Sequence, residues 1–135
     1  MKWVILTLLF SLNSSAQLPI TGTWLTGNKL AKIEVSHKAG KYEARIVWLE
    51  IPDYDGKPAH DKNNENPKLR SRKLMGLNLF EEMEVNEDGL LVGNVYDPYR
   101  GRTFYCEIWP ENKSVLNVRG YLGVFFQTKQ WTRVN

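Results

Sequence analysis

The chain has 135 residues, with 18 Lys and Arg against 15 Asp and Glu, so its formal net charge is +3. So small a basic excess argues against a strong polyanionic partner such as nucleic acid. The single cysteine, Cys106, excludes an intrachain disulfide and every metal motif built from several cysteines, and we expect neither a cofactor nor a metal.

Residues 1–16 form the first predicted element, a leader. Lys2 supplies one positive charge, residues 3–12 are mostly apolar, and Ser14-Ser15-Ala16 places small residues before Gln17. This is the pattern of a secretory signal peptide cleaved after Ala16. About ten apolar residues are too few for a bilayer span, which needs about 20. We therefore predict an exported protein, periplasmic or secreted, with residues 17–135 forming one domain that has no membrane span.

The remaining chain predicts strands and no long helix. Short β-branched and aromatic runs alternate with Gly, Asn and Asp turn signals. In the clearest run, Tyr42, Ala44, Ile46 and Trp48 share one face, as expected for a sheet with one buried side. Sequential hairpins of this kind close most economically into an up-and-down barrel, with a two-sheet sandwich and an OB-fold as alternatives. The predicted strands cover residues 21–26, 30–37, 41–50, 77–86, 90–97, 103–110, 114–121 and 125–133.

The first and last strands carry the predicted closure of the barrel. Gly22-Thr23-Trp24 opens the folded part and Trp131-Thr132-Arg133 ends it, which resembles the closure of a lipocalin-like (calycin) barrel. There the two strands pair and a guanidinium can lie over the indole, a contact that contributes roughly 0.5–2 kcal/mol. We expect Arg133 to fill this role rather than Arg119, because Arg133 lies closer to the end of the chain.

One connection, between Glu50 and Gly76, is much longer than the others. Loops beyond roughly 12–15 residues in compact domains are usually functional or disordered. Its second half, residues 66–76, has helix signals: Asn66 as a cap, Pro67 at the first helical position and Gly76 as a stop. A short helix and a basic extended arm both fit this stretch.

Segments spread over nearly all of the chain after the leader resemble, in order, a bacterial family known as domain of unknown function 2147 (DUF2147). The resemblance implies an exported lipocalin-like barrel. Two departures are visible: Arg72-Lys73-Leu74 stands where the family has Arg-Pro-Leu, and Glu82-Met83 stands where it has Gly-Phe. The matching segments are Gly22-Thr23-Trp24, residues 46–49, residues 55–58 with Asp61, Asn66-Pro67, residues 69–72, Gly76-Leu77, Tyr96-Asp97-Pro98, Gly101-Arg102-Thr103, residues 119–123 and Trp131-Thr132-Arg133.

The barrel interior and the long loop hold the candidate ligand-binding residues. Arg70 or Arg72 is the predicted polar anchor, and Arg119 either turns inward with a partner or lies outside. The loop carboxylates Asp53, Asp55 and Asp61 are best read as turn residues, with calcium binding or catalysis as alternatives. An EF-hand is excluded because Gly56 is fourth, not sixth, counting from Asp53. The candidate interior aromatics are Tyr42, Trp48, Phe104, Tyr121 and Phe126.

These features favour a non-enzymatic domain that binds a small, partly apolar ligand. The alternative is a cell-envelope interaction module that uses an outer face or the long loop. A hydrolase is a third hypothesis, and it requires His60 to converge with Asp53, Asp55 and Asp61. Cys106 falls on the apolar face of its strand and is expected to be a buried, inert thiol.

Overall fold

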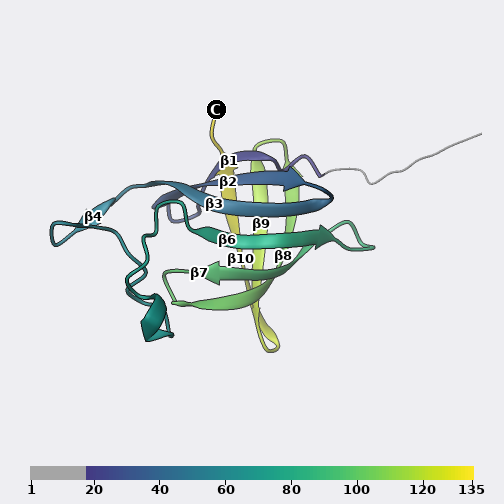
Figure 1. The fold of residues 1–135 in the computed structure, drawn as a ribbon. Coiled ribbons are helices and arrows are strands. Elements are labelled where there is room, and N and C mark those ends of the chain that lie inside the picture. The colour runs from purple at the N-terminus through teal and green to yellow at the C-terminus, as the bar shows by residue number, and fades with distance from the viewer. Residues whose placement is uncertain (1–17) are drawn as a thin grey trace, which may run out of the picture.

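Eight antiparallel strands close into a barrel in the computed structural model, which describes residues 18–135 (Figure 1). The predicted fold class is therefore confirmed, and each strand end lies within two residues of its prediction. The predicted leader, residues 1–16, lies outside the described residues. In barrel order the strands are β1 (Gly22–Leu25), β10 (Phe125–Arg133), β9 (Val115–Leu122), β8 (Arg102–Asn112), β7 (Leu91–Asp97), β6 (Asn78–Val85), β3 (Lys41–Leu49) and β2 (Ala31–Lys38).

The alternating strand directions divide the connections between two ends of the barrel. The end that carries residues 26–30, 50–77, 98–101 and 123–124 is called the open end, and the opposite one the closed end. Large buried side chains fill the closed end, where the Tyr42 hydroxyl accepts a hydrogen bond from the Leu18 N–H at 2.8 Å. They include Ile20, Trp24, Tyr42, Met83, Leu91 and Leu116.

The seam between the first and last strands is short. β1 pairs with β10 only through Trp24 with Arg133 and Leu25 with Thr132. Arg133 places its guanidinium carbon 4.3 Å from the centre of the Trp24 ring, and its three nitrogens donate to the carbonyls of Lys113, Thr21 and Pro19 at 2.7–3.0 Å. The Trp24 Nε1–H donates to the Ile20 carbonyl at 2.9 Å. One side chain thus holds the last strand, the first strand and the β8–β9 turn together.

A bulge in β3 changes which side chains face the interior. Ile33 pairs with Ile46, but the next residue of β2, Lys32, pairs with Trp48, so β3 contains one extra residue here. An extra residue moves the following side chains to the other face of the sheet. Trp48 is therefore half-exposed on the outside, where the Lys32 ammonium lies 4.7 Å from its ring centre. The prediction that Trp48 faces the interior was wrong for this reason.

The register between β3 and β6 shifts twice, and one of the shifts, between the pairs Tyr42–Met83 and Ala44–Phe80, includes Glu82. Glu82 has a φ of 54°, a left-handed conformation that costs an L-residue other than Gly roughly 1–2 kcal/mol. The Gly that the related family has at this position would adopt it freely. The next residue, Met83, is buried, and its side chain packs so closely on Gly93 that a Cβ there would lie 2.8 Å from the Met83 Cγ.

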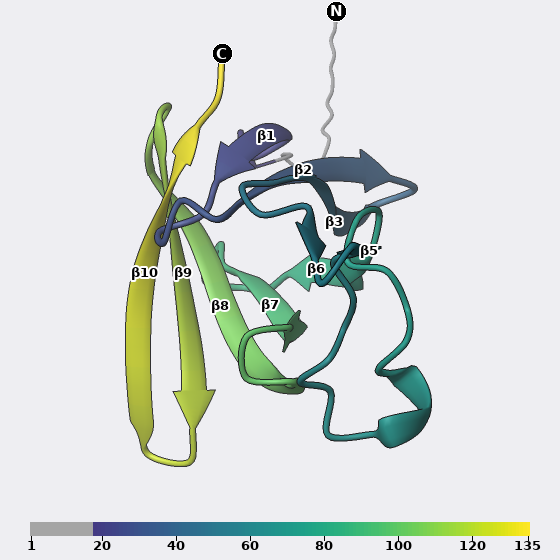
Figure 2. The ribbon, with the colours of Figure 1, turned by 90° about the vertical axis from the view of Figure 1, so that its left-hand side faces the viewer.

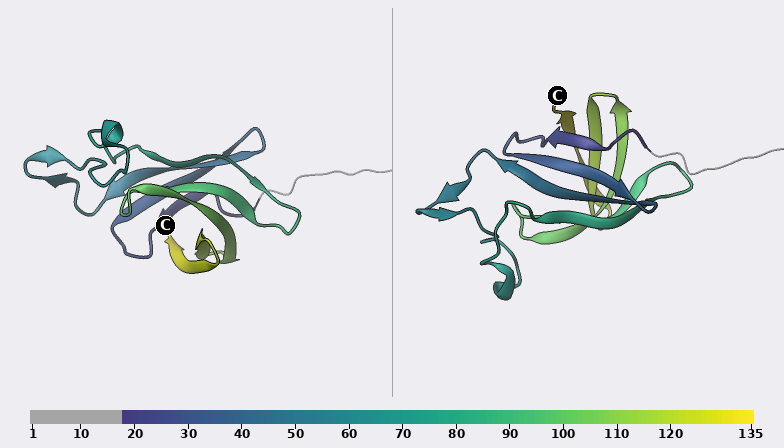
Figure 3. Two further views of the ribbon diagram at one scale, coloured as in Figure 1. Left: turned by 90° about the horizontal axis from the view of Figure 1, so that it is seen from below. Right: turned by 45° about the horizontal axis from the view of Figure 1, so that its top comes forward.

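The long connection leaves the barrel on one side (Figure 3). It begins with a hairpin of β4 (Asp53–Tyr54) and β5 (Lys57–Pro58). The predicted helix is a single 3-10 turn, η1 (Pro67–Leu69), which Asn66 caps by accepting from the Lys68 N–H at 3.1 Å. Lys73 then forms an antiparallel bridge with His60, so the loop exit is extended and not helical.

Replacing Trp24 by Ala should lower the free energy of unfolding by about 3–5 kcal/mol, because the ring is fully buried and the cavity would leave Arg133 without its aromatic partner. Urea titration followed by circular dichroism measures this. A loss below about 1 kcal/mol, the range of ordinary surface substitutions, would contradict the closing role of the indole.

Replacing Glu82 by Gly should raise the free energy of unfolding by about 1 kcal/mol, since it removes the left-handed strain. Glu81→Gly is the matched control: Glu81 lies in the same strand without a positive φ, so the same change should destabilise by roughly 0.5–1 kcal/mol. If both variants were destabilised equally, the strain at Glu82 would be disproved.

Candidate functional site

A cavity of about 760 Å³ opens into the barrel from its open end. Its size lies within the range of ligand pockets, about 300–1,000 Å³. The cavity exists because the inward positions of β8 and β9 are partly small: Gly120 faces Cys106, and a Cβ at Gly120 would lie 3.7 Å from the Cys106 sulfur. The apolar walls come from Ile33, Ile46, Leu49, Leu79, Val95, Phe104, Val118 and Trp131.

Polar and cationic groups surround the mouth of this cavity. Arg100 in the β7–β8 turn makes an ion pair at 3.0 Å with Asp97, the last residue of β7. Lys62 and Asn63 reach the mouth from the long loop, and Lys129 reaches it from β10. An apolar chamber with a largely cationic rim suits a molecule that has an apolar body and a polar or anionic head.

The structure brings only some of the predicted interior aromatics to this cavity. Phe104 lines it, with the guanidinium carbons of Arg102 and Arg100 at 5.1 and 5.9 Å from its ring centre. Tyr121 and Phe126 border it, and their rings pack together with centroids 5.8 Å apart. Tyr42 is buried in the closed end and Trp48 lies outside the barrel, and neither lines the cavity.

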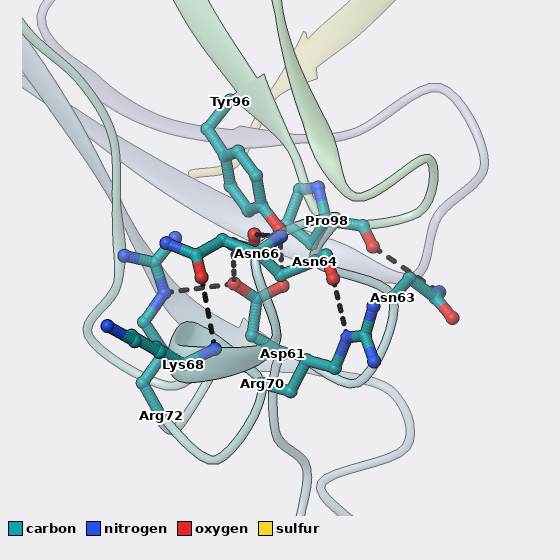
Figure 4. A network of polar contacts seen from close by, with 9 residues as sticks. All are labelled: Asp61, Asn63, Asn64, Asn66, Lys68, Arg70, Arg72, Tyr96 and Pro98. Carbon is teal, nitrogen blue, oxygen red and sulfur yellow. Dashed lines mark hydrogen bonds and ion pairs between the residues drawn. The ribbon is translucent and has the colours of Figure 1, made fainter.

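Asp61 is the centre of a polar network inside the long loop (Figure 4). Its side chain is buried, and its carboxylate accepts from the Tyr96 hydroxyl at 2.5 Å, from the Arg72 Nε–H at 2.9 Å and from the Asn64 amide at 2.8 Å. The Arg72 guanidinium also lies 5.1 Å from the Tyr96 ring centre. A buried carboxylate is tolerable only with partners of this kind, so Asp61 ties the loop to β7.

Backbone contacts extend this attachment to the β7–β8 turn. The Glu65 N–H donates to the Gly101 carbonyl at 2.9 Å, and the Asn63 side chain donates to the Tyr99 carbonyl at 3.2 Å. Gly101 has a φ of 75°, and a Cβ there would lie 1.7 Å from the Asn63 carbonyl oxygen, so only Gly fits. We call residues 60–73 the strap, because this segment is fastened across one side of the open end.

The remaining predicted site residues are dispersed. Arg70 donates from Nε to the Asn64 carbonyl at 2.7 Å, within the strap. Arg119 lies outside, over the rings of Phe126 and Trp109 at 4.4 and 5.1 Å. Asp53 and Asp55 are exposed in the β4–β5 hairpin. Among residues 18–135, no three His, Cys, Asp or Glu side chains gather as a metal site requires, so the structure does not bring the loop carboxylates and His60 together.

Cys106 is buried in the cavity wall. Burial, and to a smaller extent the nearby charge of Asp97, raises the pKa of its thiol to about 11. A thiol of this kind is almost wholly protonated at neutral pH, and a protonated thiol is a poor nucleophile.

Sequence reasoning missed most of the cavity wall and its mouth. The period-two alternation places Ile33 and Val118 inside, but it cannot show that their end of the barrel is hollow. Tyr96, Lys62, Asn63 and Arg100 are polar residues of loops or strand ends, and no spacing rule links them. Gly120 could have been found from the sequence. It is a glycine in a strand, between Arg119 and Tyr121 that face outward, and an inward glycine leaves space for a ligand.

Comparisons with known proteins agree with this geometry. The sequence pattern of a family described as "Uncharacterized protein conserved in bacteria (DUF2147)" matches residues 22–133. A solved structure of a protein from the human pathogen Helicobacter pylori, described as belonging to the lipocalin family, matches with a TM-score of 0.71. The two chains share 23% sequence identity, over 88% of this chain and 85% of that chain, which establishes likeness of fold. The comparison with curated proteins found no match.

The attachment of the strap to β7 should weaken at strongly alkaline pH. Burial, followed by the hydrogen bond to Asp61, raises the pKa of Tyr96 from 10.0 to about 12. The folded state therefore favours the protonated phenol, and this stabilisation is complete below pH 10 and is lost as the pH rises through 12. Ultraviolet titration of the phenolates should show a component near pH 12 that Tyr96→Phe removes. An unchanged titration in the variant would contradict the Tyr96–Asp61 contact.

Proposed function

We propose that this chain, which belongs to the DUF2147 family, is an exported, non-enzymatic barrel that binds one small amphiphilic molecule in the cavity at its open end. The observation that carries the proposal is the chamber of about 760 Å³ with apolar walls. A barrel of eight strands can be filled by its own side chains or can hold one small ligand, and here only the closed end is filled.

The distribution of polar groups orients such a ligand. Its apolar part would lie against apolar walls such as Val95, Val118 and Trp131, and gain roughly 25 cal/mol for each Å² of apolar surface buried. Its polar head would remain at the mouth near Lys62 and Lys129. These ammonium groups favour an anionic head, because the only carboxylate of the lining, Asp97, is already paired with Arg100.

Export is part of the proposal and rests on the leader pattern of residues 1–16. The barrel itself carries no disulfide, since Cys106 is the single cysteine. Its stability therefore depends on the filled closed end and the Arg133 seam. Among residues 18–135 no helix has the length and hydropathy to cross a membrane.

The interaction-module alternative has weaker support. It needs the long loop to be available to a partner, whereas three side chains of the strap contact the barrel itself: Asp61 accepts from Tyr96, Asn63 donates to the Tyr99 carbonyl, and Arg72 lies over the Tyr96 ring. The exposed parts of the long loop are the β4–β5 hairpin, with Ile51 next to it, and residues 65–71 of the strap.

Filling the cavity tests the proposal. Gly120→Leu adds an inward side chain at a strand position where a Cβ makes only an ordinary contact with Cys106. We expect the affinity for the apolar dye N-phenyl-1-naphthylamine to fall at least about tenfold. The affinity for dodecanoate, measured by displacement of the dye, should fall by a similar factor, since a loss of about 1.4 kcal/mol of apolar burial is enough for this. Dye fluorescence measures the affinity, and native mass spectrometry of protein from its host would detect a retained molecule.

Asn94→Leu is the matched control, because Asn94 is exposed on the outer face of β7 and does not line the cavity. It should bind the dye as the unmodified protein does. Thermal unfolding verifies that both variants fold. Equal dye affinity in Gly120→Leu and the unmodified protein, or no binding of dye or dodecanoate to the latter, would refute the proposal.

A further inference from the structure

The hairpin that joins β9 to β10 ends in an exposed apolar tip. Val124 is 87% exposed and Phe125 is 76% exposed, and Leu122 and Phe126 on either side of them are each 58% exposed. Burying large apolar side chains is the main source of folding energy, so four neighbouring ones left in water indicate a site of interaction with another molecule or a membrane. We call residues 122–126 the apolar tip.

The apolar tip stands away from the rest of the barrel. β1 pairs with β10 only at Arg133 and Thr132, so residues 125–131 of β10 have a strand partner, β9, on one side alone. The hairpin extends past the β7–β8 turn at the lower end of Figure 2. In the same view the η1 turn of the long loop ends only slightly short of the tip, on the other side of the open end.

The hairpin is held rigid by side chains on its outer face. Arg119 donates from Nε to the Thr128 hydroxyl at 2.7 Å and covers the Phe126 ring at 4.4 Å. Tyr121 packs between Tyr105 and Phe126, with ring centroids 5.9 and 5.8 Å away, and its hydroxyl donates to Glu107. The apolar tip is thus presented in one arrangement, and little conformational entropy is lost when it binds.

Most of the charged side chains near the apolar tip are cationic. The β9–β10 hairpin contains Arg119 and Lys129 and no Asp or Glu. Two carboxylates lie on neighbouring elements: Glu107, which accepts from the Tyr121 hydroxyl, and Glu65 of the strap, which lines the same groove as Leu122. Arg102 at the start of β8 and Arg100 in the β7–β8 turn add two cations, of which Arg100 is paired with Asp97, and Tyr99 of the same turn is 74% exposed. Apolar and aromatic side chains with cations behind them match the interface of an anionic bilayer, where the tip enters the acyl region and the cations meet lipid headgroups.

We propose that the apolar tip docks the open end of the barrel on the surface of an anionic lipid bilayer. A protein partner with an acidic groove or a second copy of this chain fits less well. The apolar side chains form a projecting tip and not a flat face, and the cations around them would repel the same cations of a second copy. Leu122 and Phe125 also line the mouth of the cavity, so docking would direct that mouth toward the lipid.

Vesicle flotation of the protein produced from the full sequence tests the proposal. The lipids are phosphatidylcholine alone or mixed with phosphatidylglycerol. We expect binding to the anionic vesicles that weakens with added salt. Replacing both Val124 and Phe125 by Asp should reduce it at least about tenfold, since burial of one large apolar side chain exceeds the 1.4 kcal/mol that equals this factor. Both residues are exposed, so the variant should fold normally.

Two controls separate this proposal from the others. Val85→Asp makes the same kind of change at an exposed apolar residue near the closed end and should leave vesicle binding unchanged. Gly120→Leu fills the cavity and should also bind vesicles normally. The two proposals, vesicle docking and ligand binding, are therefore tested independently.

Three outcomes would overturn the proposal. The first is no binding of the unmodified protein to anionic vesicles. The second is equal binding by the Asp variant and the unmodified protein. The third is self-association in sedimentation experiments that requires the apolar tip and occurs without vesicle binding, which would assign the tip to a second copy of the chain.

Discussion

The barrel depends on one cation, the guanidinium of Arg133. The strands it joins share only two residue pairs, so the β ladder alone gives the seam little strength. Arg133 adds a stack on the buried Trp24 ring and hydrogen bonds to three carbonyls from two other parts of the chain. Hydrogen bonds made by a charged donor are the stronger class. Closure is therefore concentrated in one side chain at one end of the molecule.

The position of this seam explains the asymmetry of the whole molecule. Near Arg133 the interior is filled by large side chains, and away from it β1 has already ended, so β10 and the strands beside it diverge from β1 and β2. The cavity, its cationic mouth and the apolar tip all lie on that divergent side. The strap compensates there: Asp61 and Gly101 fasten the long loop to β7 and the β7–β8 turn, which no strand pairing does.

The sequence was informative about the strands because alternation and turn residues are local signals. Trp48 shows the limit of such signals, since the bulge beside Ile46 arises from the pairing with β2 and leaves no mark in β3 itself. The same holds for the strap. Asp61 resembles any other polar loop residue until the fold brings Tyr96 and Arg72 to it. The departure at Glu82 was visible in the sequence, but its left-handed backbone was not. Which end of the barrel is hollow depends on packing across strands, and no local pattern encodes it.

The seam also constrains the order in which the protein can fold. Arg133 contacts the carbonyl of Thr21, 112 residues earlier in the chain. Contacts between such distant residues form slowly, because the entropy of closing the loop must be overcome before the contact stabilises anything. Every hairpin from β2 to β10 can form before the barrel closes, but the Trp24 ring stays uncovered until the last strand arrives. For a chain that crosses a membrane unfolded, as the proposed export route requires, late closure would be an advantage, since the barrel would complete itself only after translocation.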